Sequence, residues 1–290
     1  MHKSSVYLPE QLKQSLSALA ARSGYSEAFL IRRALERLVA VGGEQQDQAS
    51  APSVSRRLGP VLIGVGLGPG DPRHVTQLAK DSLTGADQVF AVSWTSHSIG
   101  RAEMLTRAVS PLVPVQRLVL DIMSGASGRR RSLVEMTVPI VAALDAGEVA
   151  VVVTLGDPSM WSIFSDIAAE VATQRPAVPV EMVPGVTSFQ ALAAATRTTL
   201  ARTGQVVMIV DGSIPSGALE SAATTLVVYK GAPDVDDIRA QVSAAGRLDH
   251  AIVGEMLGLP GQRMEPLEAM ASGPTSYLAT VIVPAGGTRS

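Results

Sequence analysis

A short apolar run that breaks into a glycine-rich turn is the feature that most constrains the fold. Residues 61–65 read Val-Leu-Ile-Gly-Val, and residues 66–72 continue as Gly-Leu-Gly-Pro-Gly-Asp-Pro. Neither common nucleotide fingerprint fits, because a dinucleotide loop needs glycine where Pro69 or Asp71 stands, and a P-loop needs Gly-Lys followed by Ser or Thr. Glycines let a backbone approach a ligand and adopt positive φ. The pattern predicts a strand that ends in a ligand-binding loop of another kind, with an ordinary strand-to-helix turn as the alternative.

Three further strands end in loops of the same kind. The β-branched run of residues 149–155 leads into Gly-Asp-Pro-Ser-Met-Trp at 156–161, and residues 178–183 lead into Pro-Gly-Val-Thr-Ser-Phe at 184–189. The fourth segment is Thr-Leu-Val-Val-Tyr-Lys-Gly at 225–231. Ligands of open α/β sheets collect outside the carboxyl ends of the strands, so four such loops indicate a single crevice.

The order of the apolar segments predicts an α/β fold. From residue 61 to about 175, strand signals alternate with helical stretches, which indicates a mainly parallel sheet. A second group of strands and helices follows. The expected strands are 61–65, 88–92, 149–155, 178–183, 206–210, 225–229, 251–254 and 277–284, and the expected helices include 75–83, 133–146, 189–197 and 235–245.

Composition restricts the class of protein. With 290 residues, 46% hydrophobic and 17% charged, the chain has material for the cores of two or three domains. It has no cysteine, which excludes disulfides, thiolate metal sites and cysteine nucleophiles. No His-Glu-x-x-His, Gly-x-Ser-x-Gly or clustered ligand set occurs, so neither a hydrolase nor a metal centre is expected. The chain opens without a signal-peptide core or a bilayer-spanning run, and we expect a cytoplasmic protein without a membrane partner.

The four loops, in this order, closely resemble the motifs of the tetrapyrrole methylase family, the class III S-adenosylmethionine-dependent methyltransferases. The resemblance covers roughly residues 58–285. Within the family, Thr154–Phe164 and Ser276–Val283 look most like the precorrin-2 or cobalt-factor II C20-methyltransferase subgroup of cobalamin biosynthesis. The resemblance implies a homodimeric enzyme with two α/β domains, residues 58–176 and 177–290, the cofactor S-adenosylmethionine in the cleft between them, and a tetrapyrrole substrate.

Nine positions are expected, by similarity to the family, to contact the cofactor. They are Pro69, Gly156, Asp157, Met160, Thr187, Ser188, Lys230, Ala279 and Thr280. Trp161 stands where the family more often has tyrosine, which leaves it a packing role or a place in the substrate wall. Lys230 stands where relatives often carry an uncharged residue, so its backbone is the expected contact. Asp157 has an alternative role as a turn-former, because Asp before Pro organises loops.

The chemistry that the resemblance implies depends on positioning more than on acid–base groups. The methyl group sits on a sulfonium, and the acceptor is an electron-rich meso carbon of a reduced tetrapyrrole. A precorrin carries many carboxylates, so Arg129, Arg130 and Arg131 are candidates for binding it, a solvated loop being the alternative. His74 and His97 could accept a proton, but each stands alone, and no catalytic residue is assigned.

Charge separates a small N-terminal body from the rest. Residues 1–40 carry six Lys or Arg against three Glu, net +3, so the remainder of a chain with net charge −2 carries −5. Residues 42–57 are polar and rich in Gly, Gln and Ser, which predicts a flexible linker.

Residues 1–41 have the pattern of a strand followed by two helices, the second capped by Ser26. The pattern resembles the ribbon-helix-helix family of DNA-binding proteins, in which two chains pair their strands. The resemblance would place Lys3, Ser5 and Tyr7 toward base edges and the amides near Ser26 toward phosphate. A unit of this size cannot bury a core alone, so dimerisation is expected, and a dimerisation module without DNA contact is the alternative.

Three functions stay open at this point. The leading hypothesis is methyl transfer to C20 of precorrin-2 or cobalt-factor II. The second is another tetrapyrrole or corrin methylase, since the cofactor loops are shared and the substrate contacts are not legible. The third is a DNA-binding regulator whose methylase body senses S-adenosylmethionine or a corrinoid.

Overall fold

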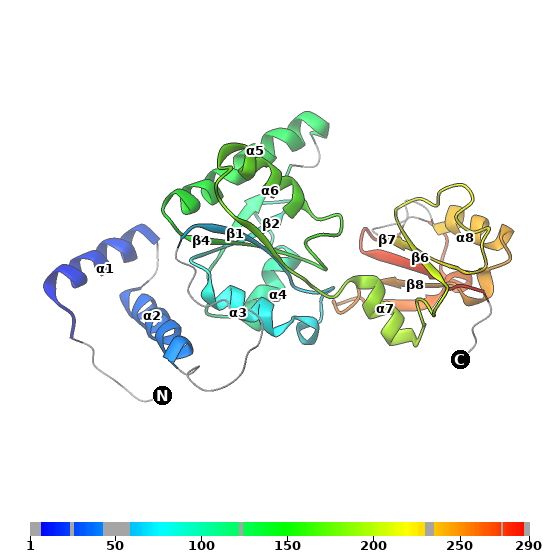
Figure 1. Ribbon diagram of the computed structural model, residues 1–290, viewed down its shortest axis with the longest axis horizontal. Coiled ribbons are helices and arrows are strands. Elements are labelled where there is room, and N and C mark those ends of the chain that lie inside the picture. Colours follow the sequence, from blue (N-terminus) through cyan, green and yellow to red (C-terminus); the bar gives the residue numbers. More distant parts are fainter. Residues whose placement is uncertain are drawn as a thin grey trace. The chain divides into compact units, whose positions relative to one another are not determined.

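The computed structural model describes residues 7–23, 26–42, 59–121, 124–229, 235–273 and 275–286. The chain divides into two compact units, Met1–Arg56 and Arg57–Ser290 (Figure 1). Among the expected contact residues, Lys3, Ser5 and Lys230 lie outside the described residues. Of the helices that the structure describes, none combines the length and apolar character that a bilayer crossing requires.

The N-terminal unit contains two helices, α1 (Glu10–Ser23) and α2 (Glu27–Gly42). Both lie where the sequence predicts helices. The hydroxyl of Ser26 accepts a hydrogen bond of 3.2 Å from the Phe29 amide and so caps the start of α2. The side-chain cap of α2 therefore forms at the expected residue.

A carboxylate on α2 ties the two helices of this unit together. Glu27 accepts hydrogen bonds from the Lys13 ammonium and from Ser17 Oγ, the latter at 2.6 Å. Tyr7 is 96% exposed and precedes α1 without regular structure. Most of the residues before α1, where the strand of this unit is expected, lie outside the described part of the chain, so the ribbon-helix-helix fold stays a prediction.

Five parallel strands form the first sheet of the Arg57–Ser290 unit, in the order β3–β2–β4–β1–β5. Their bounds are β1 Val61–Gly66, β2 Gln88–Ser93, β3 Val115–Val119, β4 Val149–Thr154 and β5 Val180–Val183. The neighbouring strands β1 and β4 are buried along their whole length. A strand covered on both faces needs apolar residues on both, which explains the unbroken run of β4.

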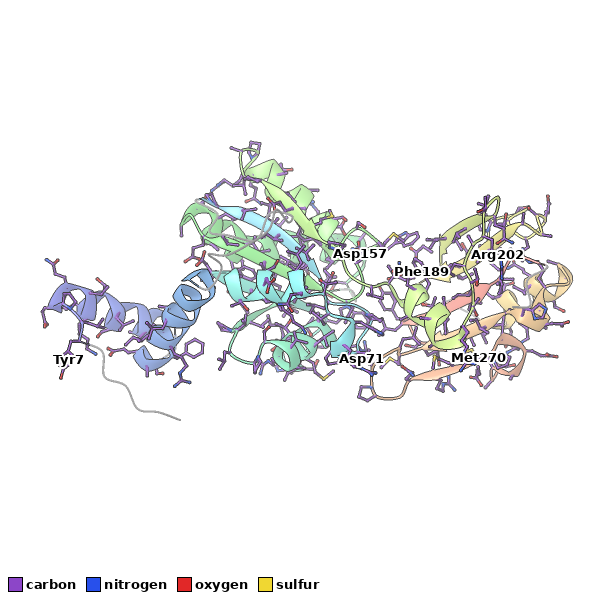
Figure 2. The ribbon with its side chains drawn as sticks, turned by 60° about the horizontal axis from the view of Figure 1, so that its bottom comes forward. Tyr7, Asp71, Asp157, Phe189, Arg202 and Met270 are labelled. Atoms are coloured by element: carbon purple, nitrogen blue, oxygen red, sulfur yellow. The ribbon has the colours of Figure 1, made fainter. Side chains whose placement is uncertain are left out.

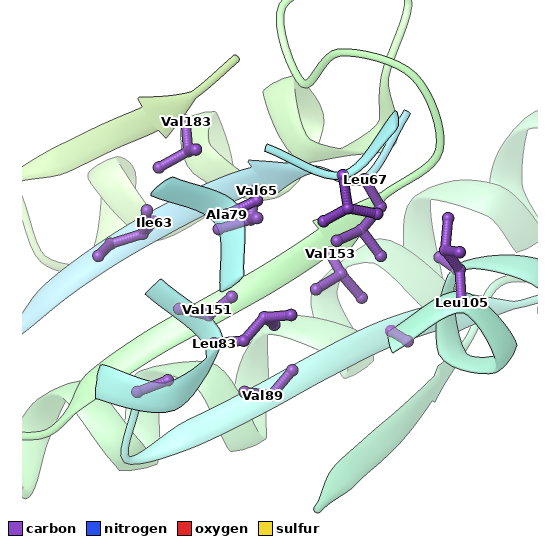
Figure 3. Close-up of a cluster of buried hydrophobic side chains, with 14 of the residues drawn as sticks. Ile63, Val65, Leu67, Ala79, Leu83, Val89, Leu105, Val151, Val153 and Val183 are labelled. Carbon is purple, nitrogen blue, oxygen red and sulfur yellow. The ribbon is translucent and has the colours of Figure 1, made fainter. Parts of the chain in front are cut away.

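Four helices cover the two faces of this sheet (Figure 1). Helices α3 and α4 pack on one face, and α5 and α6 pack on the other. Their bounds are α3 Gln77–Gly85, α4 Arg101–Val109, α5 Gly125–Asp145 and α6 Ile163–Gln174. Side chains alternate along β4, so that Val151 and Val153 join the α3–α4 core with Leu83 and Leu105 (Figure 3), while Val152 joins the α5–α6 core.

The second sheet has the order β6–β7–β10–β8–β9, with β6 and β7 parallel and the other pairs antiparallel. Its helices α7 and α8 pack on opposite faces, through Leu192 and Ile238 respectively. The bounds are α7 Ser188–Thr196, β6 Val206–Asp211, β7 Thr224–Tyr229, α8 Val235–Ala244, β8 Ile252–Glu255, β9 Arg263–Pro266 and β10 Ala279–Val283. Short 3-10 helices are η1 Pro72–His74, η2 Leu248–His250 and η3 Leu267–Ala269.

Strand β5 belongs to the first sheet, which differs from the boundary expected between residues 176 and 177. It pairs in parallel with β1, Leu62 lying opposite Val180 and Val65 opposite Val183. The pairing satisfies the backbone hydrogen bonds of β1 on the side away from β4. The chain reaches the second sheet only after β5, through α7. Residues 177–183 therefore lie with the first group of strands.

The three consecutive arginines lie within helix α5, where the sequence left a glycine-rich loop as the alternative. The helix begins at Gly125, and the absence of a Cβ on Gly128 leaves room for the Ser124 side chain, whose own Cβ would lie 2.3 Å from one built on Gly128. Arg129, Arg130 and Arg131 follow directly in the helix. They are therefore helical rather than part of a loop, but all three are exposed to solvent, so substrate binding by these arginines stays a prediction.

Helix α6 packs against strand β1 at Gly64. A Cβ built on Gly64 would lie 2.5 Å from ring carbons of Phe164, a side chain that is fully buried. The glycine at this position is therefore required by packing against α6 rather than by backbone conformation.

We expect Gly64→Ala to destabilise the Arg57–Ser290 unit by about 1–3 kcal/mol, because the Phe164 ring has to leave its position. Gly286→Ala is the matched control, since the nearest atom to a Cβ there lies at 3.5 Å and no loss is expected. Urea unfolding followed by circular dichroism measures both variants. Equal midpoints for the two would contradict this account of the packing.

Candidate functional site

Three loops meet where β1, β4 and β5 end side by side, here called the carboxyl edge of the first sheet. Glycines let these loops touch through backbone alone. A Cβ built on Gly185 would lie 2.1 Å from the carbonyl oxygen of Gly156, and one on Gly66 would lie 2.7 Å from the amide nitrogen of Gly185. No side chain fits between the loops, so these positions require glycine.

The loops after β1 and β4 are also joined by an antiparallel bridge between Gly68 and Gly156. The Gly156 amide donates to the Gly68 carbonyl at 2.8 Å, and the Gly68 amide donates to the Gly156 carbonyl at 3.3 Å. Their φ angles, +76° and +69°, lie in the left-handed region that favours glycine. Pro69 is buried in this bridged loop. Two of the loops expected to bind a ligand therefore form one hydrogen-bonded structure.

Asp157 ties the β4 loop to the β5 loop. Its Oδ2 accepts a hydrogen bond of 2.9 Å from the Gly185 amide, and its Oδ1 accepts one of 2.8 Å from the Ser159 amide. Figure 2 marks Asp157 on its loop beyond the strands, with Asp71 on the neighbouring loop. Both carboxylate oxygens are engaged with backbone, so the side chain organises the turn and fixes Gly185 at the same time.

The β5 loop passes directly into helix α7 through a capping box. Thr187 is the N-cap, and its hydroxyl and amide both donate to Gln190 Oε1, at 2.9 and 3.0 Å. The next residue reaches the second sheet, because Ser188 Oγ and Thr280 Oγ1 share a hydrogen bond of 2.7 Å. The start of α7 thus links the carboxyl edge to strand β10.

The β1 loop abuts the turn between β8 and β9. A Cβ on Gly70 would lie 2.5 Å from Leu259 Cγ, and one on Gly258 would lie 2.3 Å from the Asp71 amide nitrogen. The Arg73 side chain donates hydrogen bonds to the Asp71 carboxylate, which lower the pKa of that carboxyl to about 2. Asp71 is therefore ionised at neutral pH.

Aromatic rings line the β4 loop on the side of the second sheet. The ring of Trp161 lies 5.6 Å from that of Tyr229, and Phe189 meets Tyr229 edge-on at 6.0 Å. A Cβ on Gly156 would lie 3.1 Å from the Tyr229 hydroxyl. Burial raises the pKa of Tyr229 to about 12, although the hydrogen bond with Ser188 acts in the opposite direction and lowers it. Tyr229 is thus a neutral phenol placed against the glycine bridge.

Thr154 ends β4 with a buried hydroxyl that has no hydrogen-bond partner in the described part of the chain. The residue is only 7% exposed. Such a hydroxyl costs about 1–3 kcal/mol unless a ligand or water bonds to it. Together with loops that only glycine can line, this orphaned group fits a polar ligand bound at the carboxyl edge.

The arginines of α5 pair with helix α6. Arg129 lies 3.1 Å from the Asp166 carboxylate, and Arg130 lies 2.8 Å from that of Glu170. Arg131 is exposed. Asp166 is in the first turn of α6, the helix that follows the β4 loop, so the ion pair holds Arg129 at the start of that helix.

The expected cofactor positions gather around the three loops, apart from Lys230, which lies outside the described residues. They are Pro69, Gly156 and Asp157 in the joined loops, Met160 against the α7 core, Thr187 and Ser188 at the start of α7, and Ala279 and Thr280 in buried β10. Sequence reasoning missed Gly66, Gly185 and Tyr229 as site residues. Each stands in a motif that was recognised, but its contact depends on a partner distant in sequence.

Acid–base groups are sparse at this edge. His97 is exposed on the loop after β2, and His74 is half-buried in η1. Among the described residues, no group of three or more His, Cys, Asp or Glu could hold a metal ion. The arrangement can position a ligand by backbone and hydroxyl groups, and it offers little for proton transfer.

Residues 61–271 match the family model described as Tetrapyrrole (Corrin/Porphyrin) Methylases. The cobalamin biosynthesis protein CobIJ of Mycobacterium tuberculosis (strain ATCC 25618 / H37Rv) is 31% identical over 240 residues, which cover 79% of this chain and 47% of CobIJ. The chain thus spans about half the length of the CobIJ proteins that it matches. The precorrin-2 C(20)-methyltransferase of Sinorhizobium sp is 27% identical over 235 residues, covering 77% of this chain and 94% of that protein.

Solved structures share the fold. A putative cobalamin synthesis related protein (CobF) from Corynebacterium diphtheriae superposes with a TM-score of 0.59 at 16% identity, covering 78% of this chain and 98% of that one. A uroporphyrin-III C-methyl transferase from Thermus thermophilus, complexed with S-adenyl homocysteine, gives 0.52 at 23% identity, with 77% and 92% covered. The expected α/β fold of the methylases is confirmed.

We expect Asp157→Asn to destabilise the Arg57–Ser290 unit by about 1–3 kcal/mol. An NH2 group replaces one of the two carboxylate oxygens and cannot accept the hydrogen bond that the Gly185 or the Ser159 amide donates to that oxygen. Asp166→Asn is the control, since it breaks only a surface ion pair worth at most about 1 kcal/mol. Urea unfolding of both variants measures the difference. A loss at Asp157 no larger than at Asp166 would show that the loop tie is unimportant.

We expect Tyr229 to make the free energy of unfolding decrease at alkaline pH. Its pKa is raised from 10.0 to about 12, so the neutral phenol stabilises the fold below pH 10, and this contribution is lost as pH rises from 10 towards 12. Tyr229→Phe has no such group, and its unfolding free energy should decline less over this range than that of the wild type. Parallel curves for the two proteins, in urea titrations across this range, would refute the assignment.

Proposed function

The chain belongs to the family of tetrapyrrole (corrin/porphyrin) methylases, whose methyl donor is S-adenosylmethionine, and from this we propose that it methylates C20 of precorrin-2 or cobalt-factor II in cobalamin biosynthesis. Two relatives support the position on the ring. They are named precorrin-2 C(20)-methyltransferase and cobalt-precorrin-2 C(20)-methyltransferase, each is 27% identical to this chain, and the matches cover 94% and 95% of those proteins.

The convergence of the loops after β1, β4 and β5 carries the proposal. The closeness of Gly66, Gly156 and Gly185 leaves only backbone facing the ligand at this point. Backbone carbonyls and amides suit a cofactor that has a cationic sulfonium between polar amino-acid and adenosine ends. Bound there, S-adenosylmethionine supplies an electrophilic methyl group.

The residues proposed to hold the cofactor divide into two kinds. The loop residues Pro69, Gly156 and Asp157 contribute backbone, because both oxygens of the Asp157 carboxylate are already engaged. The hydroxyls of Ser188 and Thr280 lie at the junction with the second sheet and bond to each other. Met160, Thr187, Ala279 and Lys230 complete the proposed set.

Substrate binding is proposed at the same edge. Arg131 and the exposed face of Arg129 would meet substrate carboxylates, and Trp161, which is 41% exposed, would form part of the wall. Residues 1–41 are proposed to pair two chains, with DNA contact through Lys3, Ser5 and Tyr7 as a further prediction. The location proposed for the enzyme is the cytoplasm.

The direct experiment supplies the purified protein with S-adenosylmethionine and either precorrin-2 or cobalt-factor II. We expect one methyl group to be transferred and NMR of the product to locate it at C20. Transfer to another carbon would place the protein among the other corrin methylases. A lack of transfer to both substrates would overturn the proposal.

A variant that lacks residues 1–56 separates the enzyme from the regulator. The hydrophobic cores that the described residues form lie in the Arg57–Ser290 unit, so we expect this unit to fold without the N-terminal one. An enzyme keeps its turnover without the N-terminal unit. A regulator instead shows operator binding by the full chain that depends on S-adenosylmethionine.

A further inference from the structure

Both tryptophans of this chain stand on loops that follow strands of the first sheet. Aromatic residues make up only 3% of the sequence, with 2 Trp and 4 Tyr. Trp94 follows β2 and meets Tyr277 edge-on, with ring centroids 5.6 Å apart and planes at 75°. Trp161 follows β4, the neighbour of β2, and meets Tyr229. The rarest large side chains are thus concentrated beside the candidate site.

The Trp94–Tyr277 pair is open to solvent. The two residues are 49% and 51% exposed although their rings touch. Tyr277 also contributes, after burial, to the raised pKa of Tyr229. About half of each residue of the pair is therefore accessible to a ligand.

A buried ion pair braces the loop that carries Trp94. Glu103 is 1% exposed and accepts hydrogen bonds from Arg117, at 2.8 and 3.1 Å. The third nitrogen of the same guanidinium donates to the Ser96 carbonyl at 2.7 Å, two residues after Trp94. Burial would raise the pKa of Glu103, and the bonds from Arg117 and Arg107 outweigh it and lower that pKa.

The loop that carries Tyr277 is braced in the same way. Glu255 is 6% exposed and accepts from Arg263 Nε at 3.0 Å. Its other oxygen accepts a hydrogen bond of 2.8 Å from the amide of Ser276, the residue before Tyr277. A buried carboxylate is costly unless it is paired and fully hydrogen-bonded. Two buried carboxylates that each fix an exposed loop therefore indicate that these loops need defined positions.

We propose that Trp94 and Tyr277 form an aromatic clasp that contacts the tetrapyrrole substrate, with Glu103, Arg117 and Glu255 as its positioning residues. The clasp rests on the proposed function, because its ligand is the conjugated macrocycle. Aromatic rings stack on such a surface or meet it edge-on, and rings held in place beforehand lose little entropy when they bind it. The rival explanation is a packing contact between the two loops without any role in binding.

The first test uses fluorescence. In Trp161→Phe, Trp94 is the only tryptophan, so its emission reports on the clasp. We expect precorrin-2, added with S-adenosylhomocysteine to prevent turnover, to quench this emission at the concentration at which it binds. Binding without any change in Trp94 emission would overturn the proposal.

The second test uses kinetics. Trp94→Ala and Tyr277→Ala should each raise KM for precorrin-2 by about tenfold, with KM for S-adenosylmethionine unchanged, and Trp94→Phe should restore most of the loss. Glu103→Gln should raise the same KM less and shift the Trp94 emission. Leu112→Ala is the control, because Leu112 is 47% exposed in the turn that precedes β3, at the opposite end of the strands.

Calorimetry with S-adenosylhomocysteine distinguishes failure of the clasp proposal from failure of the proposed function. Wild-type affinity in the variants shows that they are folded and that the cofactor loops are intact. If these variants also keep the wild-type KM for precorrin-2, the clasp is wrong and the proposed function stands. If the wild type neither binds S-adenosylhomocysteine nor methylates precorrin-2, the proposed function fails and the clasp with it.

Discussion

Close backbone contact between three strand ends is the constraint on which the site depends. Gly66, Gly156 and Gly185 leave no volume between the loops of β1, β4 and β5, and a single carboxylate, Asp157, holds two of these loops together. Rigid loops of this kind lose little conformational entropy when a ligand binds, because they are ordered beforehand. The loops thus hold the strand ends together and also form the proposed binding surface, where backbone groups rather than ionisable side chains would contact the ligand.

Much of this arrangement could be predicted from sequence, because the signals are local. The valine run of β4 is legible since both its faces are covered, and the glycines after β1 stand out since they follow an apolar strand. Strand β3 was missed because it is an edge strand with Gln116 and Arg117 in its middle, which obscures the apolar pattern. Helix α4 was missed for a similar reason, since its buried face includes Glu103.

Contacts between distant segments could not be predicted in the same way. The hydrogen bond from the Gly185 amide to Asp157 joins residues 28 positions apart, and it exists only because β4, β1 and β5 lie side by side in that order. The membership of β5 in the first sheet depends on the same pairing and left no local trace. The family resemblance pointed to loops that the structure brings together, whereas the contacts of Gly66 and Tyr229 are visible only in the geometry.

Helix α7 connects the halves of the larger unit mechanically. Its first turn is anchored to the β5 loop by the Thr187 cap, and its body packs on the second sheet, where Ser188 bonds to Thr280. A tilt of the second sheet would therefore move α7, and with it the β5 loop that contains Gly185. Such a movement of the second sheet would thus change the position of the β5 loop, which contacts Gly66 and Gly156.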